Sequence, residues 1–533
     1  MPPSETLSAS FAEGVRTHPE RVFGWFVARD GTSRTLSWGW MGERASRAAA
    51  GLRAAGAREG DIVLLVVEPG ADLPALFLGA SLAGCVPAIL SFPTPKIDKA
   101  VYWSHLAGLV EHSGAKWIVT YPAFAAVAAE KEIRTSAKIL LSDELLLSAP
   151  LDPANLARPS LDDVALLQHS SGTTGLHKGV ALTHRSLFAQ AARYAEAIRM
   201  NETDVIASWL PLYHDMGLIA CFVIPLLRRV PVATMSPFDW VANPVLLWRV
   251  VAAHRATLAW LPNFSLEVLA RFVSPKQTEN LDLSSLRLIT NCSEICRPAT
   301  HRAFLKRYGF PPERLGISYA MAENTFAVTQ TPLGTAPRVD LLDGREVFTV
   351  GPPIGGNAFE IRPSEEGDGE IWVKSDSMLA GYHKRPDLDA ECVQGGWFCT
   401  GDLGYLVGDE LVVTGRKKEV LILAGRNFYA GDIEAIASKV AGVKAGRAVA
   451  FGVPSDATGT EDLVVVAERD PGSDRAEAEI VRDLKESVAK DLDCVVNVVR
   501  IVDDRWLVKT TSGKISRSEN KRKFTAESRP AGA

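Results

Sequence analysis

The chain has 533 residues, a length that favours more than one domain with ample core. Its formal net charge is only −5, which gives no support to nucleic-acid binding as the main role. The first 21 residues contain no apolar run, so no secretory signal is expected. The longest uncharged stretch, 73–95, contains several prolines and reads as helix then strand, so we expect no membrane span and a cytosolic protein.

The first part of the chain alternates strand and helix patterns. Residues 62–67, 71–83 and 86–90 read as strand, helix and strand, and continuous apolar strands joined by helices indicate a parallel sheet covered on both faces. Further strands are predicted at 117–120, 139–141, 205–209, 232–234, 258–260 and 286–289, and an apolar helix at 217–227. Residues 1 to about 330 are therefore expected to form a large, doubly wound α/β body.

The pattern changes after residue 332. A small β subdomain over about 333–415 is predicted from short segments at 358–361, 370–373 and 410–413. A small α+β domain is predicted from helices at 432–440 and 475–492 and strands at 464–466 and 496–501. We expect an N-terminal domain over 1–415, a connection at 416–418 and a C-terminal domain over 419–533.

Residues 169–179, HSSGTTGLHKG, follow a predicted strand at 164–167 and precede a helix expected from about Arg185. Hydroxyl groups, glycines that allow close backbone approach and the charge of Lys178 can wrap a polyphosphate, although such a segment can equally be a simple turn. It is not a Walker loop, because Gly179 follows the lysine. A P-loop kinase or ATPase is therefore disfavoured.

The same segment resembles the phosphate loop of the adenylate-forming enzymes, a superfamily of acyl-CoA synthetases, fatty acyl-AMP ligases, peptide-synthetase adenylation domains and luciferases. Their loop reads approximately TSGTTGxPKG, so Ser170 replaces the first threonine and His177 the proline. The resemblance implies that ATP contacts the following residues: Ser170, Ser171, Gly172, Thr173, Thr174, Gly175 and Lys178.

Five further stretches match this superfamily in its order, as far as Arg517. They are WLPLYHDMGL at 209–218, NCSE at 291–294, YAMAE at 319–323, WFCTGDLG at 397–404 with TGRKK at 414–418, and KTTSGKISR at 509–517. One such match is weak, but six in order are strong. The amino-acid sequence of the stretch at 209–218 is most similar to the corresponding motif of fatty acyl-AMP ligases.

The resemblance places His214 beside the bound carboxylate of the acid. Ser293 and Glu294 belong to the segment that forms the adenine wall, where Cys292 and Ser293 replace glycine and alanine and narrow the site. Cys292 and Cys296 lack a partner pair with zinc spacing, so we expect reduced, buried thiols.

Tyr319 is expected to stack on the adenine, next to Ala320, which replaces the usual glycine. Glu323 is expected to hold Mg²⁺, which prefers oxygen ligands, together with the hydroxyl of Thr174. Asp402 suits the two ribose hydroxyls, with Arg416 in support.

Lys514 would bridge the acid's carboxylate and the α-phosphate of ATP, giving acyl-AMP and pyrophosphate. The resemblance then implies that the C-terminal domain rotates about Lys418, which moves Lys514 away and opens a path for a thiol lined by Ala424 and Gly425. The thiol belongs either to the phosphopantetheine of an acyl carrier protein or to free CoA. The ligase branch carries an insertion in the region covered here by residues 324–350, which are fewer than expected.

An apolar acid is expected from the candidate wall residues Leu218, Phe222, Trp260 and Phe264. Three readings of function stay open: a ligase that delivers to a carrier protein, an acyl-CoA synthetase of secondary metabolism, and a nucleotide-binding protein that has lost catalysis. Loss of catalysis is considered because four residues differ from the motifs of the superfamily: Ser170, His177, Cys292 and Ala320. Nucleotide binding without release of pyrophosphate would favour it.

Overall fold

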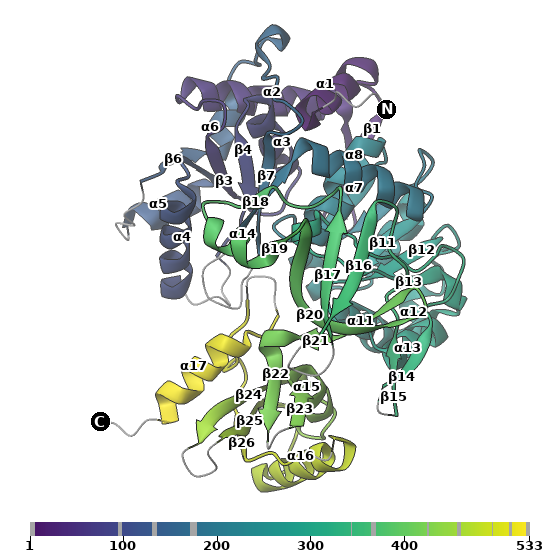
Figure 1. Ribbon diagram of the computed structural model, residues 1–533. Helices are drawn as coiled ribbons and strands as arrows, with labels where there is room; N and C mark the ends of the chain where they lie inside the picture. Colours follow the sequence, from purple (N-terminus) through teal and green to yellow (C-terminus); the bar gives the residue numbers. More distant parts are fainter. Residues whose placement is uncertain are drawn as a thin grey trace.

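The structure, a computed structural model, describes residues 6–93, 99–130, 136–170, 178–342, 344–363, 369–423, 426–455, 460–492, 494–510 and 514–528. Figure 1 shows a large N-terminal part and, below it, a smaller group of elements that runs from β22 to α17. The expected fold class, a large α/β part followed by a small α+β domain, is confirmed. The domain boundaries at 415 and 419 stay a prediction.

The largest sheet has seven strands in the order β13-β12-β11-β9-β10-β1-β2. Its neighbouring strands are parallel except β1 and β2. Strands β9, β11, β12 and β13 are buried along their whole length, as apolar parallel strands covered on both faces must be. The strands are β1 Val22–Val27, β2 Ser33–Ser37, β9 Ile206–Ser208, β10 Val232–Met235, β11 Leu258–Leu261, β12 Leu288–Asn291 and β13 Leu315–Ile317.

A second sheet, β4-β3-β5-β6, is parallel throughout. It contains β3 Ile62–Val66, β4 Val86–Ile89, β5 Trp117–Thr120 and β6 Lys138–Leu141. Helix α3 (Asp72–Leu82) crosses from β3 to β4, so the strand–helix–strand pattern predicted at 62–90 is confirmed.

Helices connect these strands. They are α1 Leu7–Thr17, α2 Trp38–Ala54, α4 Lys99–Ser113, α5 Pro122–Glu130, α6 Ser142–Leu147, α7 His184–Ala197, α9 Pro237–Ala242, α10 Leu246–His254, α11 Asn263–Phe272, α12 Pro275–Thr278 and α13 Pro298–Tyr308. Within the described residues, no helix has both the length and the hydropathy that crossing a bilayer requires.

The apolar helix predicted at 217–227 divides into two. Met216–Val223 is a π-helix (η2), and Ile224–Arg228 forms α8. The residue that caps the π-helix is Asp215, whose side chain accepts a hydrogen bond from the Met216 backbone N–H. A Cβ atom on Gly217 would lie 2.2 Å from the carbonyl oxygen of Pro211, so only glycine allows this close backbone approach. Single π-helical turns occur often at functional sites.

A three-stranded antiparallel sheet, β18-β8-β7, carries the predicted phosphate loop between two of its strands. β7 is Val164–Ser170, β8 is Lys178–Thr183 and β18 is Gly381–Tyr382. β18 comes from the range assigned to the β subdomain but pairs with β8 of the N-terminal body. Backbone hydrogen bonds therefore join the range of the predicted β subdomain to the N-terminal body.

The other strands of this range form a five-stranded sheet and a hairpin. The sheet contains β16 Asn357–Arg362, β17 Gly369–Ser375, β19 Val393–Gln394, β20 Trp397–Val407 and β21 Glu410–Arg416, with α14 Pro386–Cys392 beside β18. The hairpin pairs β14 (Val339–Leu342) with β15 (Arg345–Phe348). This hairpin lies in the region 324–350, for which no strand was predicted.

The C-terminal domain has helices near the predicted positions. It contains β22 Val420–Leu423, β23 Arg426–Tyr429, α15 Ala430–Ala437, β24 Val443–Ser455, β25 Thr460–Arg469, α16 Glu477–Leu492, β26 Val498–Val502 and α17 Arg517–Ser528. A short turn, η5 (Lys417–Glu419), connects it to β21. The predicted hinge residue Lys418 lies in that turn and is exposed.

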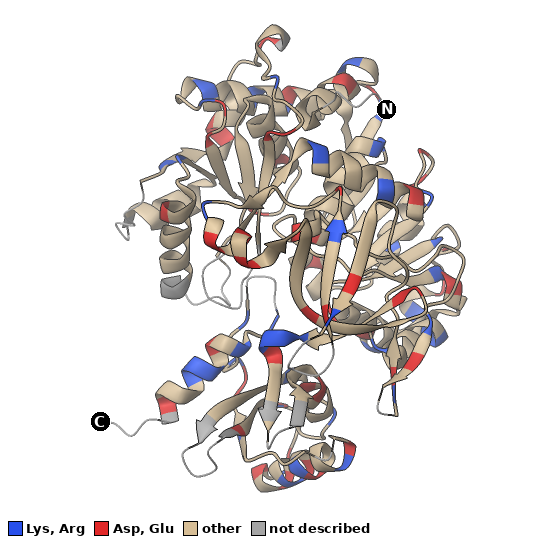
Figure 2. Ribbon diagram, in the orientation of Figure 1, with Lys and Arg blue, Asp and Glu red and all other residues tan. Residues whose placement is uncertain are grey.

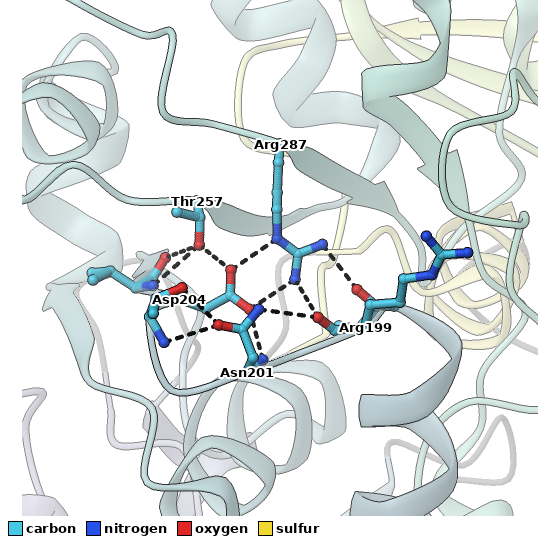
Figure 3. A network of polar contacts seen from close by, with 8 residues as sticks. Arg199, Asn201, Asp204, Thr257 and Arg287 are labelled. Atoms are coloured by element: carbon cyan, nitrogen blue, oxygen red, sulfur yellow. Dashed lines mark hydrogen bonds and ion pairs between the residues drawn. The ribbon is translucent and has the colours of Figure 1, made fainter.

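A buried polar network ties together the amino ends of three central strands (Figure 3). Asp204, which is 2% exposed, accepts hydrogen bonds from Arg287 at 2.8 and 2.7 Å and from Thr257 at 2.6 Å. Arg287 also donates to the carbonyl oxygens of Ile198 and Arg199 at the end of α7. The network fixes the strands from the edge opposite to their carboxyl ends.

Candidate active site

Three of the predicted motifs meet at the carboxyl edge of the seven-stranded sheet. β9 leads into residues 209–215, β12 into 292–294, and β13 into 319–323. Parallel strands place their carboxyl ends at one edge, and this edge is where ligands bind in open α/β sheets. Asn291 pairs with Leu261 on one side and Ile317 on the other, so the loops that follow are neighbours.

Lys514 reaches this edge from the C-terminal domain. Its Nζ atom donates a hydrogen bond to the backbone oxygen of Ser293 at 2.7 Å, across 221 residues of sequence. Ser293 has a φ of +77°, a left-handed conformation that is uncommon outside glycine. The structure therefore brings together the predicted catalytic lysine and the predicted adenine wall.

His214 and Asp215 lie beside this contact. The Nδ1 atom of His214 is 2.6 Å from Oδ1 of Asp215, and the Met216 N–H donates to the same oxygen at 2.7 Å. Burial raises the pKa of Asp215, but the charge and hydrogen bond of His214, the Met216 N–H and the charge of Lys514 outweigh it. The pKa of Asp215 is therefore lowered, and the residue is a carboxylate at neutral pH.

Glu294 follows Ser293 and is bonded to the backbone. Its Oε1 atom accepts a hydrogen bond from the Phe264 N–H at 2.6 Å, which fixes the loop after β12 to the start of α11. Glu294 is exposed, whereas the preceding Cys292 is fully buried. Cys292 and Cys296 are both free and buried, as expected.

Asp402, Tyr319 and Arg416 form a second cluster. Tyr319 donates its hydroxyl hydrogen to Oδ2 of Asp402 at 2.5 Å, and Arg416 Nε donates to Oδ1 at 3.0 Å. Asp402 and Arg416 are directly opposite on β20 and β21. Burial, together with the charge and hydrogen bond of Asp402, raises the pKa of Tyr319, so this phenol stays protonated. A carboxylate offers about four lone-pair positions, so Asp402 keeps acceptor capacity for two hydroxyl groups.

A third cluster joins Glu323 to Lys178 through Tyr382. The Tyr382 hydroxyl donates to Oε1 of Glu323 at 2.7 Å, and Lys178 Nζ lies 4.9 Å from the centre of the Tyr382 ring. Tyr382 is buried on β18, opposite Val180. Sequence reasoning missed Tyr382, because its position depends on the pairing of β18 with a strand about 200 residues earlier.

Several predicted residues lie outside the described part or are described only in their backbone. Ser171, Gly172, Thr173, Thr174 and Gly175 lie outside it, as do His177, Ala424 and Gly425. The backbone of Ser170 ends β7, opposite Lys178. Ala320 forms an isolated bridge with Ala327 and is half-buried.

The side chains around Glu323 suit a magnesium ion that takes most of its ligands from the phosphates of the nucleotide. Among the described residues, no group of three or more His, Cys, Asp and Glu side chains could hold a metal by itself. Mg²⁺ is commonly bound by one or two carboxylates together with substrate phosphates. Glu323 offers such a carboxylate, held in place by Tyr382 on the side of Lys178.

The candidate wall for an apolar acid is only partly suitable. Trp260 is core, since it is 1% exposed and its Nε1 donates to the Tyr194 hydroxyl at 2.8 Å. Leu218 and Phe222 are likewise buried in the π-helix. Phe264 is 45% exposed, and its ring packs against Trp209 and Trp240. Of the four, Phe264 is thus the accessible one.

A separate cavity of about 390 Å³ lies among residues of β3, β4, β7 and the start of α7. Its lining includes Cys85, Asp163, His184 and His383 and none of the predicted site residues. Burial lowers the pKa of His184 to about 4, so its neutral ring accepts a hydrogen bond from the Leu7 N–H. This cavity is distinct from the three clusters described above.

The family model and the related proteins that match this chain indicate the same kind of enzyme. The model of the AMP-binding enzyme family matches residues 11–383. A putative acyl-CoA synthetase of Caulobacter vibrioides is 30% identical, covering 89% of this chain and 88% of its own length. A medium-chain-fatty-acid–[acyl-carrier-protein] ligase of Moorena producens is 33% identical, covering 68% of each chain.

The fold has a close counterpart among solved structures. A structure from a study of fatty acyl-adenylate ligases of E. coli and L. pneumophila superposes with a TM-score of 0.89 at 24% identity, covering 98% of both chains. The superposition extends over the large N-terminal part and the small C-terminal domain alike.

Proposed function

This chain belongs to the AMP-binding enzyme family, and from that premise we propose how its own residues carry out the reaction. It is an adenylate-forming acid ligase, which uses ATP to convert a carboxylic acid into acyl-AMP with release of pyrophosphate. A carboxylate is a poor electrophile, because its charge repels nucleophiles and it has no good leaving group. Acyl-AMP removes both obstacles, since AMP leaves readily.

Lys514 and His214 act on the acid in this proposal. The acid's carboxylate oxygen forms a bond to the α-phosphorus, and the bond from that phosphorus to the β-phosphate oxygen breaks. The Lys514 ammonium group stabilises the negative charge that develops on the α-phosphoryl oxygens, and His214 orients the carboxylate. The observation that carries this assignment is the 2.7 Å contact of Lys514 Nζ with Ser293, which places the lysine at the carboxyl edge of the sheet.

The nucleotide is assigned to the other two clusters. Asp402 accepts from the ribose hydroxyls, Arg416 holds Asp402 in place, and Tyr319 contacts the adenine. Lys178 and the loop that precedes it hold the phosphates, and Glu323 supplies a ligand to Mg²⁺. When bound, Mg²⁺ neutralises charge on the phosphates and on the departing pyrophosphate.

The acyl acceptor is proposed to be the phosphopantetheine thiol of a carrier protein. The hairpin β14–β15 contacts the C-terminal domain, with Arg345 Nη1 2.7 Å from Oδ2 of Asp432 on α15. Residues 324–350 contain this hairpin but are fewer than expected for the insertion of the ligase branch, so the support for a carrier protein comes from the relative named as a medium-chain-fatty-acid–[acyl-carrier-protein] ligase. Figure 2 shows Lys and Arg residues along α17 and at the segment that joins β21 to β22, which suits a phosphate-bearing acceptor of either kind.

Free CoA is the second candidate acceptor, because one of the relatives is named as an acyl-CoA synthetase. The test is mass spectrometry of the products from ATP, Mg²⁺ and a panel of apolar acids, with either CoA or a phosphopantetheinylated carrier protein. Acyl-AMP that is transferred to the carrier and not to CoA supports the proposal. Efficient formation of acyl-CoA would replace it by the second candidate, and nucleotide binding without acyl-AMP would indicate a protein that has lost catalysis.

A further inference from the structure

Asp215 lies between His214 and the first turn of the π-helix η2, at the carboxyl edge of the seven-stranded sheet. It caps the π-helix η2 through the Met216 N–H and lies 2.6 Å from Nδ1 of His214. The side chains of His214 and Asp215 are 26% and 17% exposed, so both remain accessible at the edge of the sheet. The next residue, Met216, accepts the Ser293 hydroxyl hydrogen at 3.5 Å.

We propose that Asp215 is a positioning residue for adenylation, which fixes the imidazole of His214 toward the acid and draws Lys514 into the site. The proposal rests on the function assigned above, because it deepens the roles of His214 and Lys514. Nδ1 of His214 lies 3.4 Å from the Met216 nitrogen but only 2.6 Å from Oδ1 of Asp215. An ionised carboxylate can only accept hydrogen bonds, so at the shorter contact Nδ1 carries the hydrogen. The second ring nitrogen, Nε2, is then the atom left for the acid's carboxylate.

The charge of Asp215 also acts on Lys514. Lys514 is one of the charges that lower the pKa of Asp215, so the two attract each other. Ser293 connects them in space, since its hydroxyl contacts Met216 and its carbonyl oxygen accepts from Lys514 at 2.7 Å. The Lys514 ammonium group, which comes from the C-terminal domain, thus lies near the segment 214–216, where Asp215 carries a negative charge.

Helix capping alone does not require an aspartate. Asn and Ser cap helices about as well as Asp does, since the cap needs only one side-chain oxygen. Only Asp supplies both the cap and a charge for the His214 Nδ1 hydrogen. A capping role and a positioning role therefore make different predictions for Asp215→Asn and Asp215→Ser.

The test is a double-mutant cycle of Asp215→Asn with His214→Gln, measured by ATP–pyrophosphate exchange with the best acid of the panel. Asp215→Asn should lower kcat/KM about 10- to 100-fold, as loss of an orienting partner does, while the melting temperature stays unchanged. In the His214→Gln background the same change should cost much less, because its partner is already gone. Asp215→Ser should behave like Asp215→Asn.

The matched control is Asp239→Asn, which removes an acid from the first turn of the neighbouring helix α9 and should leave exchange unchanged. Full activity of Asp215→Asn would overturn the proposal. So would an equal loss in both backgrounds, which would leave Asp215 with a structural role only. Absence of acyl-AMP from the wild-type protein with every acid would instead contradict the proposed function, so the two failures can be told apart.

Discussion

Lys514 is the residue from which the largest effect on the first half-reaction is expected. Lys514→Ala removes the cation that we propose stabilises the α-phosphoryl oxygens, so adenylation should fall about 100- to 1000-fold or more. Thioester formation from supplied acyl-AMP should continue, because the proposed rotation of the C-terminal domain moves Lys514 away before that step. The measurement is pyrophosphate release in one assay and thioester formation in the other, and unimpaired pyrophosphate release by the variant would rule out the assigned role.

Tyr382 allows a separate test of the magnesium side of the site. Tyr382→Phe keeps the ring beside Lys178 but removes the hydroxyl that donates to Glu323. The concentration of Mg²⁺ needed for half-maximal adenylation should rise about tenfold, as is common when the partner of a metal ligand is lost. Tyr405→Phe, which removes a hydroxyl bonded to Asp340, is the control and should leave this concentration unchanged. An unchanged requirement in Tyr382→Phe would contradict the role given to Glu323.

At the scale of elements, the network around Asp204 holds the amino ends of β9, β11 and β12 (Figure 3). Arg287→Ala leaves the buried carboxylate without its cation and should lower the free energy of unfolding by about 3 kcal/mol. Arg255→Ala breaks an exposed pair with Asp282 and should change it by less than about 1 kcal/mol. Urea denaturation at pH 7 measures both, and equal effects would contradict the importance given to the network.

The same network predicts a dependence of stability on pH. Burial raises the pKa of Asp204, but hydrogen bonds from Arg287, Thr257 and the Asn201 N–H and the charge of Arg287 outweigh it and lower the pKa below 3.8. Its stabilising contribution is therefore complete above the unfolded pKa and is lost as the pH falls through the lower folded value. The stability difference between wild type and Asp204→Asn should shrink below about pH 4, and a constant difference down to pH 3 would contradict this.

Local sequence patterns predicted some elements better than others. β3, α3 and β4 were located within about one residue because long apolar runs bounded by glycine and charge leave little choice. The π-helix at 216–223 was missed, because apolar composition does not distinguish its hydrogen bonds from those of an α-helix. Glu323, Asp402 and Lys514 could be selected from motif order, whereas Tyr382 and the hairpin β14–β15 depend on strand pairing over long distances.

At the scale of the whole molecule, the two parts meet through a few polar contacts. Besides Lys514, Arg345 pairs with Asp432, and Arg297 donates to the carbonyl oxygen of Gly431 at 3.3 Å. Arg345→Ala should slow adenylation by about 2- to 5-fold, because a half-exposed ion pair contributes up to about 1 kcal/mol to this arrangement. Arg302→Ala, whose partner Glu346 lies in the same N-terminal part, is the control in single-turnover assays. Equal rates for both variants would contradict a holding role for the hairpin.

Adenylation by this chain begins when the acid's carboxylate attacks the α-phosphorus of ATP. The most direct measurement uses an acid labelled with oxygen-18 in its carboxylate, followed by mass spectrometry of the AMP formed after transfer to a thiol. Attack at the α-phosphorus and later cleavage of the carbonyl C–O bond leave one labelled oxygen on AMP, so its mass should rise by about two units. Unlabelled AMP, or release of ADP in place of AMP, would contradict the account.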